Sequence, residues 1–178
     1  MMNLSLIRKL GMIMVVALLL SVSQSAEGRY QEGLDAYKRK DFGTAFKELR
    51  PFAEQGDAVA QKNLGLMYTH GTDVPKDYKL AVKWFRKSAE QGNAGAQFNM
   101  GSIYGDGYGV PQDYELAVKW FRKSAEQGLA NSQRNLGLMY EKGHGVPKDY
   151  ELALKWFRKS AKHGNASAQK ALKIILRK

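Results

Sequence analysis

The side chains that could perform chemistry in this 178-residue chain are few and poorly spaced for it. Its three histidines are His70, His144 and His163, and no His-Glu-x-x-His segment or other paired metal spacing joins them. Cysteine is absent, which excludes disulfides, a thiol nucleophile and cysteine-ligated zinc. We therefore expect no metal and no cofactor, and we interpret His70 and His144 as solvated side chains in turns.

Two further patterns could suggest catalysis. Ser88, Ser124 and Ser160 recur at one position, but a serine nucleophile needs a base and an oxyanion site, and neither accompanies them. The glycine-rich segment 105–109 has no preceding strand and no following lysine-serine pair, so it is predicted to be a turn rather than a phosphate-binding loop. The sequence therefore predicts a binding protein and no enzyme, with a hydrolase kept only as a remote alternative.

The positions of these residues follow an internal repeat. The segment from Lys83 to Ala89 recurs unchanged at 119–125 and at 155–161, each time 36 residues later. Turn and helix-end residues keep the same spacing: Pro75, Pro111 and Pro147; Tyr78, Tyr114 and Tyr150; Gly92, Gly128 and Gly164. A period in this range is typical of stacked-repeat architectures.

Each repeat is predicted to form two helices joined by a turn. The first, near 58–70, has an apolar face and ends at Gly71, because glycine tolerates the left-handed conformation that closes a helix. Asp77 is placed to cap the second helix, whose apolar stripe includes Trp84 and Phe85. One hairpin cannot bury this stripe alone, so successive hairpins must shield one another. We therefore predict an all-α fold, an α/α solenoid of helix-turn-helix repeats with a 36-residue period.

The solenoid is expected to fill residues 27–178. Its ends differ from its middle, as terminal repeats should. The expected units are a degenerate first repeat at 28–56, full repeats at 57–92, 93–128 and 129–164, and a C-terminal capping helix at 165–178.

The repeated pattern resembles the Sel-one-like repeat (SLR) family, which is related to the tetratricopeptide repeat. The resemblance is carried by Ala96 to Tyr104 and Gly107 to Gly128, and it is strong over 57–164. It implies a right-handed superhelix and a scaffolding, adaptor or chaperone-like role, often at bacterial envelopes. Some cysteine-rich relatives have been linked to β-lactam binding, but this chain lacks their cysteines, so that link is not carried over.

The N-terminal segment is predicted to be a secretory signal peptide at 1–26. Arg8 and Lys9 precede an apolar run from Leu10 to Leu20, and small or polar residues follow. The run is short for a membrane span, which needs about 20 residues, although an uncleaved anchor is the alternative. Cleavage is expected after Ser25 or Ala26. We therefore expect a bacterial protein exported to the periplasm, or secreted, with no transmembrane span in the mature chain.

The exposed face of the second helices is predicted to be cationic. Removing Arg8 and Lys9 with the leader leaves 26 of the 28 basic residues against 17 acidic ones, a formal charge of +9. Such a stripe would suit an anionic envelope lipid or glycan, whereas nucleic acid is disfavoured for an exported chain. The plainer interpretation is a solvated helix face. The stripe comprises Lys83, Arg86, Lys87, Lys119, Arg122, Lys123, Lys155, Arg158 and Lys159.

The first helices are predicted to form a concave groove for a peptide or protein partner, which is the leading functional hypothesis. Asn63, Asn99 and Asn135 recur along it, and an amide can both donate to and accept from a peptide backbone. They could equally bond to a neighbouring repeat. The position before each asparagine varies and could set specificity, and a large apolar residue there could anchor a ligand or simply pack. These variable residues are Lys62, Phe98 and Arg134.

Overall fold

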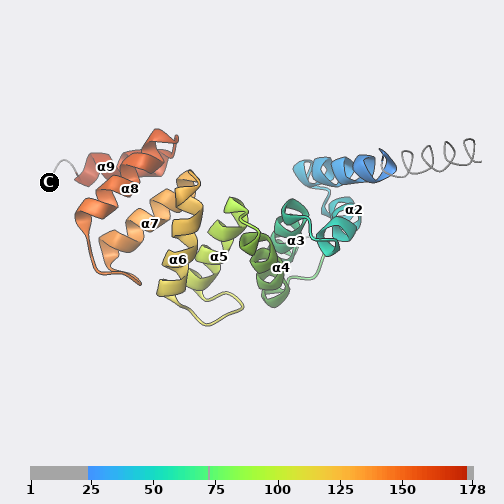
Figure 1. Ribbon diagram of the computed structural model, residues 1–178, viewed down its shortest axis with the longest axis horizontal. Helices are drawn as coiled ribbons and strands as arrows, with labels where there is room; N and C mark the ends of the chain where they lie inside the picture. Colours follow the sequence, from blue (N-terminus) through green and yellow to red (C-terminus); the bar gives the residue numbers. More distant parts are fainter. Residues whose placement is uncertain (1–23, 72, 176–178) are drawn as a thin grey trace, which may run out of the picture.

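The computed structural model describes residues 24–71 and 73–175, and within them it contains nine helices and no strand. The first helix spans residues 24–38. The others form an arched row of hairpins (Figure 1). Their bounds are α2 Phe42–Glu54, α3 Ala58–His70, α4 Tyr78–Glu90, α5 Ala94–Asp106, α6 Tyr114–Glu126, α7 Ala130–Lys142, α8 Tyr150–Lys162 and α9 Ala166–Ile175.

The helices pack in chain order, which confirms the predicted α/α solenoid. Each first helix packs against the second helix of its own repeat, in the pairs α3–α4, α5–α6 and α7–α8. It also packs against the second helix of the repeat before it, in the pairs α2–α3, α4–α5, α6–α7 and α8–α9. Burial therefore comes from neighbours along the row, as in other linear repeat arrays.

Local capping sets where the helices begin and end. The predicted cap is confirmed at Asp77, whose carboxylate accepts from the Leu80 backbone N–H at 2.9 Å. Asp113 and Asp149 make the same bond in the later repeats. Gly71 closes α3 with φ +72, in the left-handed region that favours glycine.

The core of each repeat is a phenylalanine ring packed on a glycine. Phe121 of α6 is 2% exposed, and its ring lies against Gly101 in the middle of α5. A Cβ atom on Gly101 would stand only 2.6 Å from Phe121 Cδ1, so glycine is what allows the two helices to approach. The same pairing recurs as Phe85 on Gly65 and Phe157 on Gly137. The tryptophans of the predicted apolar stripe are only half-buried, so the phenylalanines are the main core residues.

Buried polar side chains fasten each hairpin to its neighbours. Ser124 is fully buried, and its hydroxyl donates to the Ala94 carbonyl at 2.7 Å, joining α6 to the start of α5. Gln97 donates to the Ala89 carbonyl at 3.1 Å, joining α5 to the preceding repeat. The equivalents of Ser124 are Ser88 and Ser160, and those of Gln97 are Gln61 and Gln133.

The ends of the array depart from the repeat. At the N-terminal end, Tyr30 packs edge-on against Phe52 and donates to Asp57 at 3.0 Å. At the C-terminal end, α9 carries Lys173 where the full repeats have the core glycine, so a phenylalanine could not pack there in the same way. Ile174, beside Lys173 on α9, is 62% exposed, since no further described helix packs over it.

The predicted leader lies mostly outside the described residues. Residues 24–26, at its end, form part of the first helix, so both expected cleavage positions fall within helical backbone. None of the helices in the described part of the chain has the length and apolarity of a membrane span.

Candidate functional site

Two hollows open between successive first helices. One, of about 320 Å³, lies between α3 and α5 and is called pocket A here. The accessible wall of pocket A is mainly apolar. Two aromatic side chains in this wall, Tyr78 and Tyr108, are stacked with ring centroids 5.1 Å apart. Pocket A is lined by Leu66, Thr69, His70, Tyr78, Phe85, Asn99, Ser102, Ile103, Asp106 and Tyr108.

The other hollow, pocket B, has about 280 Å³ and lies one repeat further on, between α5 and α7. It has the same plan, with Tyr114 and His144 stacked at 4.5 Å in place of the two tyrosines. This contact corrects the expectation that His144 is simply solvated, because its ring is half-buried. Pocket B is lined by Ser102, Gly105, Asp106, Tyr114, Phe121, Asn135, Leu138, Met139, Lys142 and His144.

The two pockets are successive copies of one site. Ser102 and Asp106 line both of them, so α5 forms the ridge between pocket A and pocket B. The loops that close them depend on glycine: Gly109 has φ +74, and a Cβ there would lie 2.8 Å from Tyr78 Cβ. The pockets and their ridge together are called the first-helix groove below.

The predicted groove residues are only partly placed in this groove. Asn99 lines pocket A and Asn135 lines pocket B, and the Asn99 amide bonds to no other described residue. Asn63 differs, because it is 3% exposed. The asparagines therefore do not form one uniform ladder.

The three variable residues beside the asparagines lie outside both pocket linings. Phe98 packs inward, with its ring centroid 5.9 Å from that of Phe121, so it serves the core of its own hairpin. Lys62 is half-buried, and desolvation lowers the pKa of its ammonium group. Arg134 donates to the neighbouring Asn135 side chain at 3.2 Å.

Sequence reasoning missed the aromatic pairs that wall the pockets. From the sequence, Tyr78 and Tyr114 show only the 36-residue spacing of the repeat. Their stacking partners, Tyr108 and His144, belong to the turn of the next repeat. The signal was present in the 36-residue spacing of these tyrosines and of the glycine turns that follow. The contact between consecutive repeats became visible only once the hairpins were stacked.

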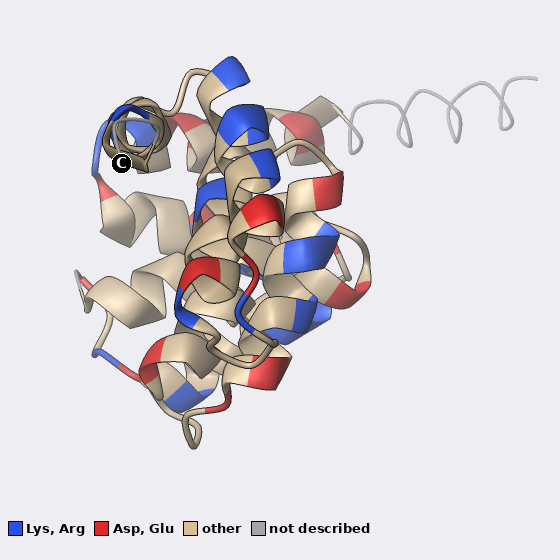
Figure 2. Cartoon of the chain, turned by 90° about the vertical axis from the view of Figure 1, so that its left-hand side faces the viewer, with Lys and Arg blue, Asp and Glu red and all other residues tan. Residues whose placement is uncertain are grey.

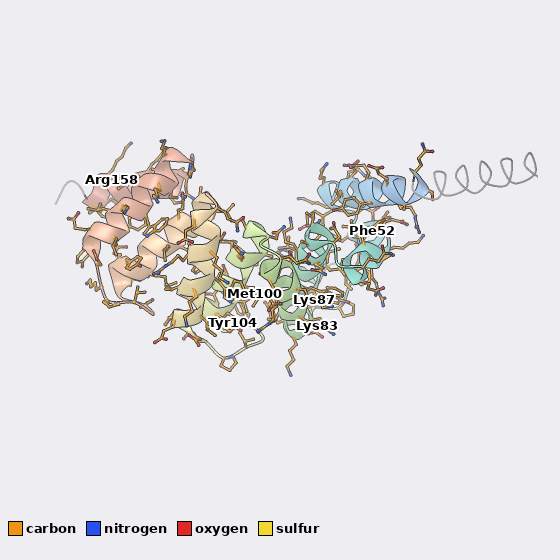
Figure 3. The ribbon with its side chains drawn as sticks, viewed as in Figure 1. Phe52, Lys83, Lys87, Met100, Tyr104 and Arg158 are labelled. Carbon is orange, nitrogen blue, oxygen red and sulfur yellow. The ribbon has the colours of Figure 1, made fainter. Side chains whose placement is uncertain are left out.

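The predicted cationic stripe is exposed but not free. Arg86 donates to the Tyr104 hydroxyl at 2.9 Å, and Arg122 donates to the Tyr140 hydroxyl at 2.7 Å, each tying one repeat to the next. Arg158 has no such bond within the described residues. Figure 3 places Lys83 and Lys87 on α4, mid-array, and Arg158 near the end that carries α9.

Three of the six lysines of the stripe lie over tryptophan rings. Lys87 Nζ is 4.8 Å from the Trp84 ring centroid, a cation–π geometry. Lys123 over Trp120 and Lys159 over Trp156 repeat it at 4.9 and 4.4 Å. Seen from the end of the array that carries α9, both basic and acidic segments are visible (Figure 2). The stripe is partly structural, because three of its lysines cover tryptophan rings and two of its arginines bond to tyrosines.

A third hollow, of about 370 Å³, lies on the stripe side. Its lining carries both signs of charge, since two glutamates face three cations. The lining residues are Glu115, Val118, Lys119, Arg122, Lys123, Glu126, Gly145 and Val146.

The three serines and two of the three histidines considered for catalysis have structural partners. The repeated serine hydroxyls donate to backbone carbonyls, as described above. His163 Nδ1 lies 2.9 Å from Gln133 Oε1, in the position where Gln127 donates to Gln97 one repeat earlier. Across residues 24–71 and 73–175, no group of three His, Cys, Asp or Glu side chains could hold a metal ion.

Solved structures of similar proteins have the same architecture. The chain is similar to a Sel1 repeat protein from Oxalobacter formigenes, with 36% sequence identity over 82% of this chain and 58% of that chain, and a TM-score of 0.78. It is similar to a protective antigen present in uropathogenic Escherichia coli strains that displays an SLR fold, with 38% identity, 85% and 34% coverage, and a TM-score of 0.77. This chain thus spans about half and about a third of their lengths.

A more distant structure shares the fold alone. The cysteine-rich protein B of Helicobacter pylori is 18% identical, with a TM-score of 0.61, and the match covers 73% of this chain and 96% of that one. No curated protein matches this chain.

The repeats themselves match a family model. The model of the Sel1 repeat matches residues 58–93, 94–129 and 130–165, which is more than half of the chain. These three segments are the ones that fold into the full hairpins α3–α4, α5–α6 and α7–α8. The chain therefore belongs to the Sel1 repeat family.

Proposed function

We propose that this protein binds an extended segment of a protein partner in the first-helix groove. Sel1 repeat proteins are generally protein–protein interaction scaffolds and are typically non-catalytic. The observation that carries the proposal is the repetition of one hollow: pockets A and B each have a stacked aromatic pair in the wall, and each presents an asparagine amide. Such a row of equivalent pockets suits a chain that crosses successive repeats.

The asparagines supply the second part of the argument. Asn99 is half-buried and makes no bond to another described residue, so its donors and acceptor are available to a ligand. Asn135 uses only its carbonyl oxygen, which accepts from Arg134. An extended backbone has an unpaired N–H and C=O at each residue, and these two amides could pair with it at intervals of one repeat.

Site-specific photocrosslinking in the native cell tests the proposal. A photoreactive amino acid at Ser102, on the ridge of the groove, should capture a defined protein, whereas the same group at Lys83 on the opposite face should not. The crosslink should disappear in an Asn99→Ala, Asn135→Ala double variant that still folds. Equal capture from both faces, or capture that survives the double variant, would rule out the groove as the binding surface.

An anionic envelope component is the second candidate. One observation favours it: residues 129–178 contain 11 basic and 3 acidic residues, so the positive charge gathers toward one end of the chain. In addition, every ion pair in the described part of the chain lies within residues 32–54, so no stripe cation makes one there. A lipid headgroup or a glycan phosphate would bind by charge.

This candidate needs variants that spare the packing. Because Arg86 and Arg122 hold neighbouring repeats together, charge reversal is better placed at Lys83, Lys119 and Lys155. Co-sedimentation with vesicles containing anionic phospholipid should weaken steeply with added salt and be lost in the triple Lys→Glu variant. Binding that is indifferent to both changes would remove the candidate.

We also propose that the protein is exported, to the periplasm or the medium. The support is the three-part layout of residues 1–26. N-terminal sequencing of the protein purified from the periplasmic fraction should begin at Ala26 or Glu27. A start at Met1 in that fraction would show that the leader is retained.

A further inference from the structure

The residue at the end of each first helix differs in charge along the groove. His70, Asp106 and Lys142 are the last residues of α3, α5 and α7, and they occupy equivalent positions 36 residues apart. All three are exposed, and all three line a pocket: His70 lines pocket A, Lys142 lines pocket B, and Asp106 lines both. None of them takes part in an ion pair within the described residues.

Asp106 stands where the helix disfavours it. The carboxyl end of a helix carries partial negative charge, so a cation there is stabilising and an anion is destabilising. Lys142 suits this position and a neutral His70 is compatible with it, whereas the Asp106 carboxylate adds to the negative potential of its helix end. The helix itself therefore gives no reason for an aspartate at position 106.

The surroundings of Asp106 deepen this negative spot. The turns after α3 and α7 contain Lys76 and Lys148, which lie against Gly71 and Gly143. The corresponding residue after α5 is the neutral Gln112, which donates to the Gly105 carbonyl. The middle repeat 93–128 also has 3 basic and 4 acidic residues, whereas the repeat after it has 7 and 3.

We propose that the first-helix groove selects an extended peptide with a basic residue over Asp106, an apolar residue in each pocket, and acidic residues beyond them. The proposal rests on the proposed function and specifies the partner segment that this site takes. A Lys or Arg would meet the Asp106 carboxylate and the end of α5. Acidic residues would meet Lys142 on one side and Lys76 on the other, since Lys76 lies against Gly71 at the end of α3 and its Nζ is 4.7 Å from the ring centroid of Tyr78 in pocket A.

The spacing of the segment follows from helix packing. Packed helices lie about 8–10 Å apart. Successive first helices line one shared pocket, so the second helix is offset to one side of the line that joins them, and their separation is only a little larger, roughly 11–13 Å. An extended chain rises about 3.3 Å per residue and points alternate side chains to one face. One repeat therefore matches about four residues, with the ridge and the next pocket about two residues apart.

These distances give a symmetric nine-residue pattern: acidic, x, apolar, x, basic, x, apolar, x, acidic. The probe is the capped peptide Glu-Ser-Leu-Ser-Lys-Ser-Leu-Ser-Glu, which presents the same order in either chain direction. The matched control is Lys-Ser-Leu-Ser-Glu-Ser-Leu-Ser-Glu, which has the same composition and net charge. Fluorescence anisotropy with labelled peptides and the mature chain at low salt compares their affinities.

The native chain is expected to bind the probe about two- to fivefold more tightly than the control, the range for an exposed ion pair. Asp106→Lys should abolish or invert this preference. Glu126→Lys makes the same charge change in the same repeat on the other face, and it should leave the preference intact. Loss of the preference in both variants would overturn the role of Asp106.

Equal affinity for the two peptides, or binding of neither, would also overturn the proposed segment. The photocrosslinking experiment tells these results apart from failure of the proposed function. If Ser102 still captures a partner in an Asn99-dependent way, the groove binds a protein that lacks this charge pattern. If that capture fails as well, both proposals are refuted.

Discussion

Replacing Gly101 with alanine is expected to destabilise the array, although alanine is the better helix former. The new Cβ would lie 2.6, 2.7 and 2.9 Å from three atoms of the Phe121 ring, where ordinary contact begins near 3.4 Å. Phe121 is 2% exposed, so its ring has little room to withdraw. The α5 and α6 helices must therefore separate by a large part of an ångström.

The magnitude follows from two opposed effects. A Gly→Ala change inside a helix stabilises it by about 1 kcal/mol. Overpacking a close-packed core is destabilising, commonly by about 1–3 kcal/mol. The two effects together give a net fall in the free energy of unfolding of about 0–2 kcal/mol, and the overlap with three ring atoms places the expected value toward the upper end.

The same helix provides a control. Gly105 also lies in α5, but a Cβ there would be 3.8 Å from Ala117 Cβ, an ordinary contact. Gly105→Ala should therefore raise the free energy of unfolding by about 0.5–1 kcal/mol. Urea denaturation followed by far-ultraviolet circular dichroism compares the two variants with the native chain.

A second change locates the effect. Phe121→Leu removes the ring that the new methyl group would strike, so Gly101→Ala should be less harmful in a chain that already contains Phe121→Leu. Finding Gly101→Ala as stable as Gly105→Ala would refute the claim that the ring contact requires glycine.

Three further outcomes are expected. Tyr104→Phe removes the hydroxyl that accepts from Arg86 and should lower the free energy of unfolding by about 0.5–1.5 kcal/mol, measured by urea denaturation; no change would show that this bond contributes nothing. Ser124→Ala removes the buried hydroxyl that donates to the Ala94 carbonyl. It should lower the free energy of unfolding by about 1 kcal/mol, while the helix content of the folded protein, measured by circular dichroism, stays the same. Burial, together with the hydrogen bond to the Asp57 carboxylate, raises the pKa of the Tyr30 hydroxyl from 10.0 to about 12. The stability that this hydroxyl contributes is therefore complete below pH 10.0 and is lost as the pH rises toward 12. Thermal unfolding across this range should show a smaller alkaline loss of stability for Tyr30→Phe than for the native chain.

The repeat architecture was predictable because local signals and periodicity agree. The 36-residue spacing, the aspartate caps and the glycine helix ends each point to the same hairpin, and the structure confirms the helices and their stacking. Ser88, Ser124 and Ser160, which recur at one position of the repeat, are buried and bond to backbone carbonyls. The family resemblance is confirmed by the match to the Sel1 repeat.

The relative depth of adjacent aromatic residues was not predictable from helical spacing. Trp84 and Phe85 are consecutive residues, and the apolar stripe predicted for the second helix is wide enough to include both. Only the position of Gly65 on the facing helix decides that the Phe85 ring enters the core. The tryptophan is left at the margin, where Lys87 covers it.

By itself, the sequence determined that this protein is a row of helical hairpins without an evident catalytic set, because period, caps and apolar stripes are properties of one repeat. The tertiary structure alone decided which residues share a surface between repeats. Pockets A and B, the stacked pair of Tyr114 and His144, and the ridge at Asp106 are each built from consecutive repeats. Side chains 30 or 36 positions apart meet only after stacking fixes the rotation of one hairpin on the next.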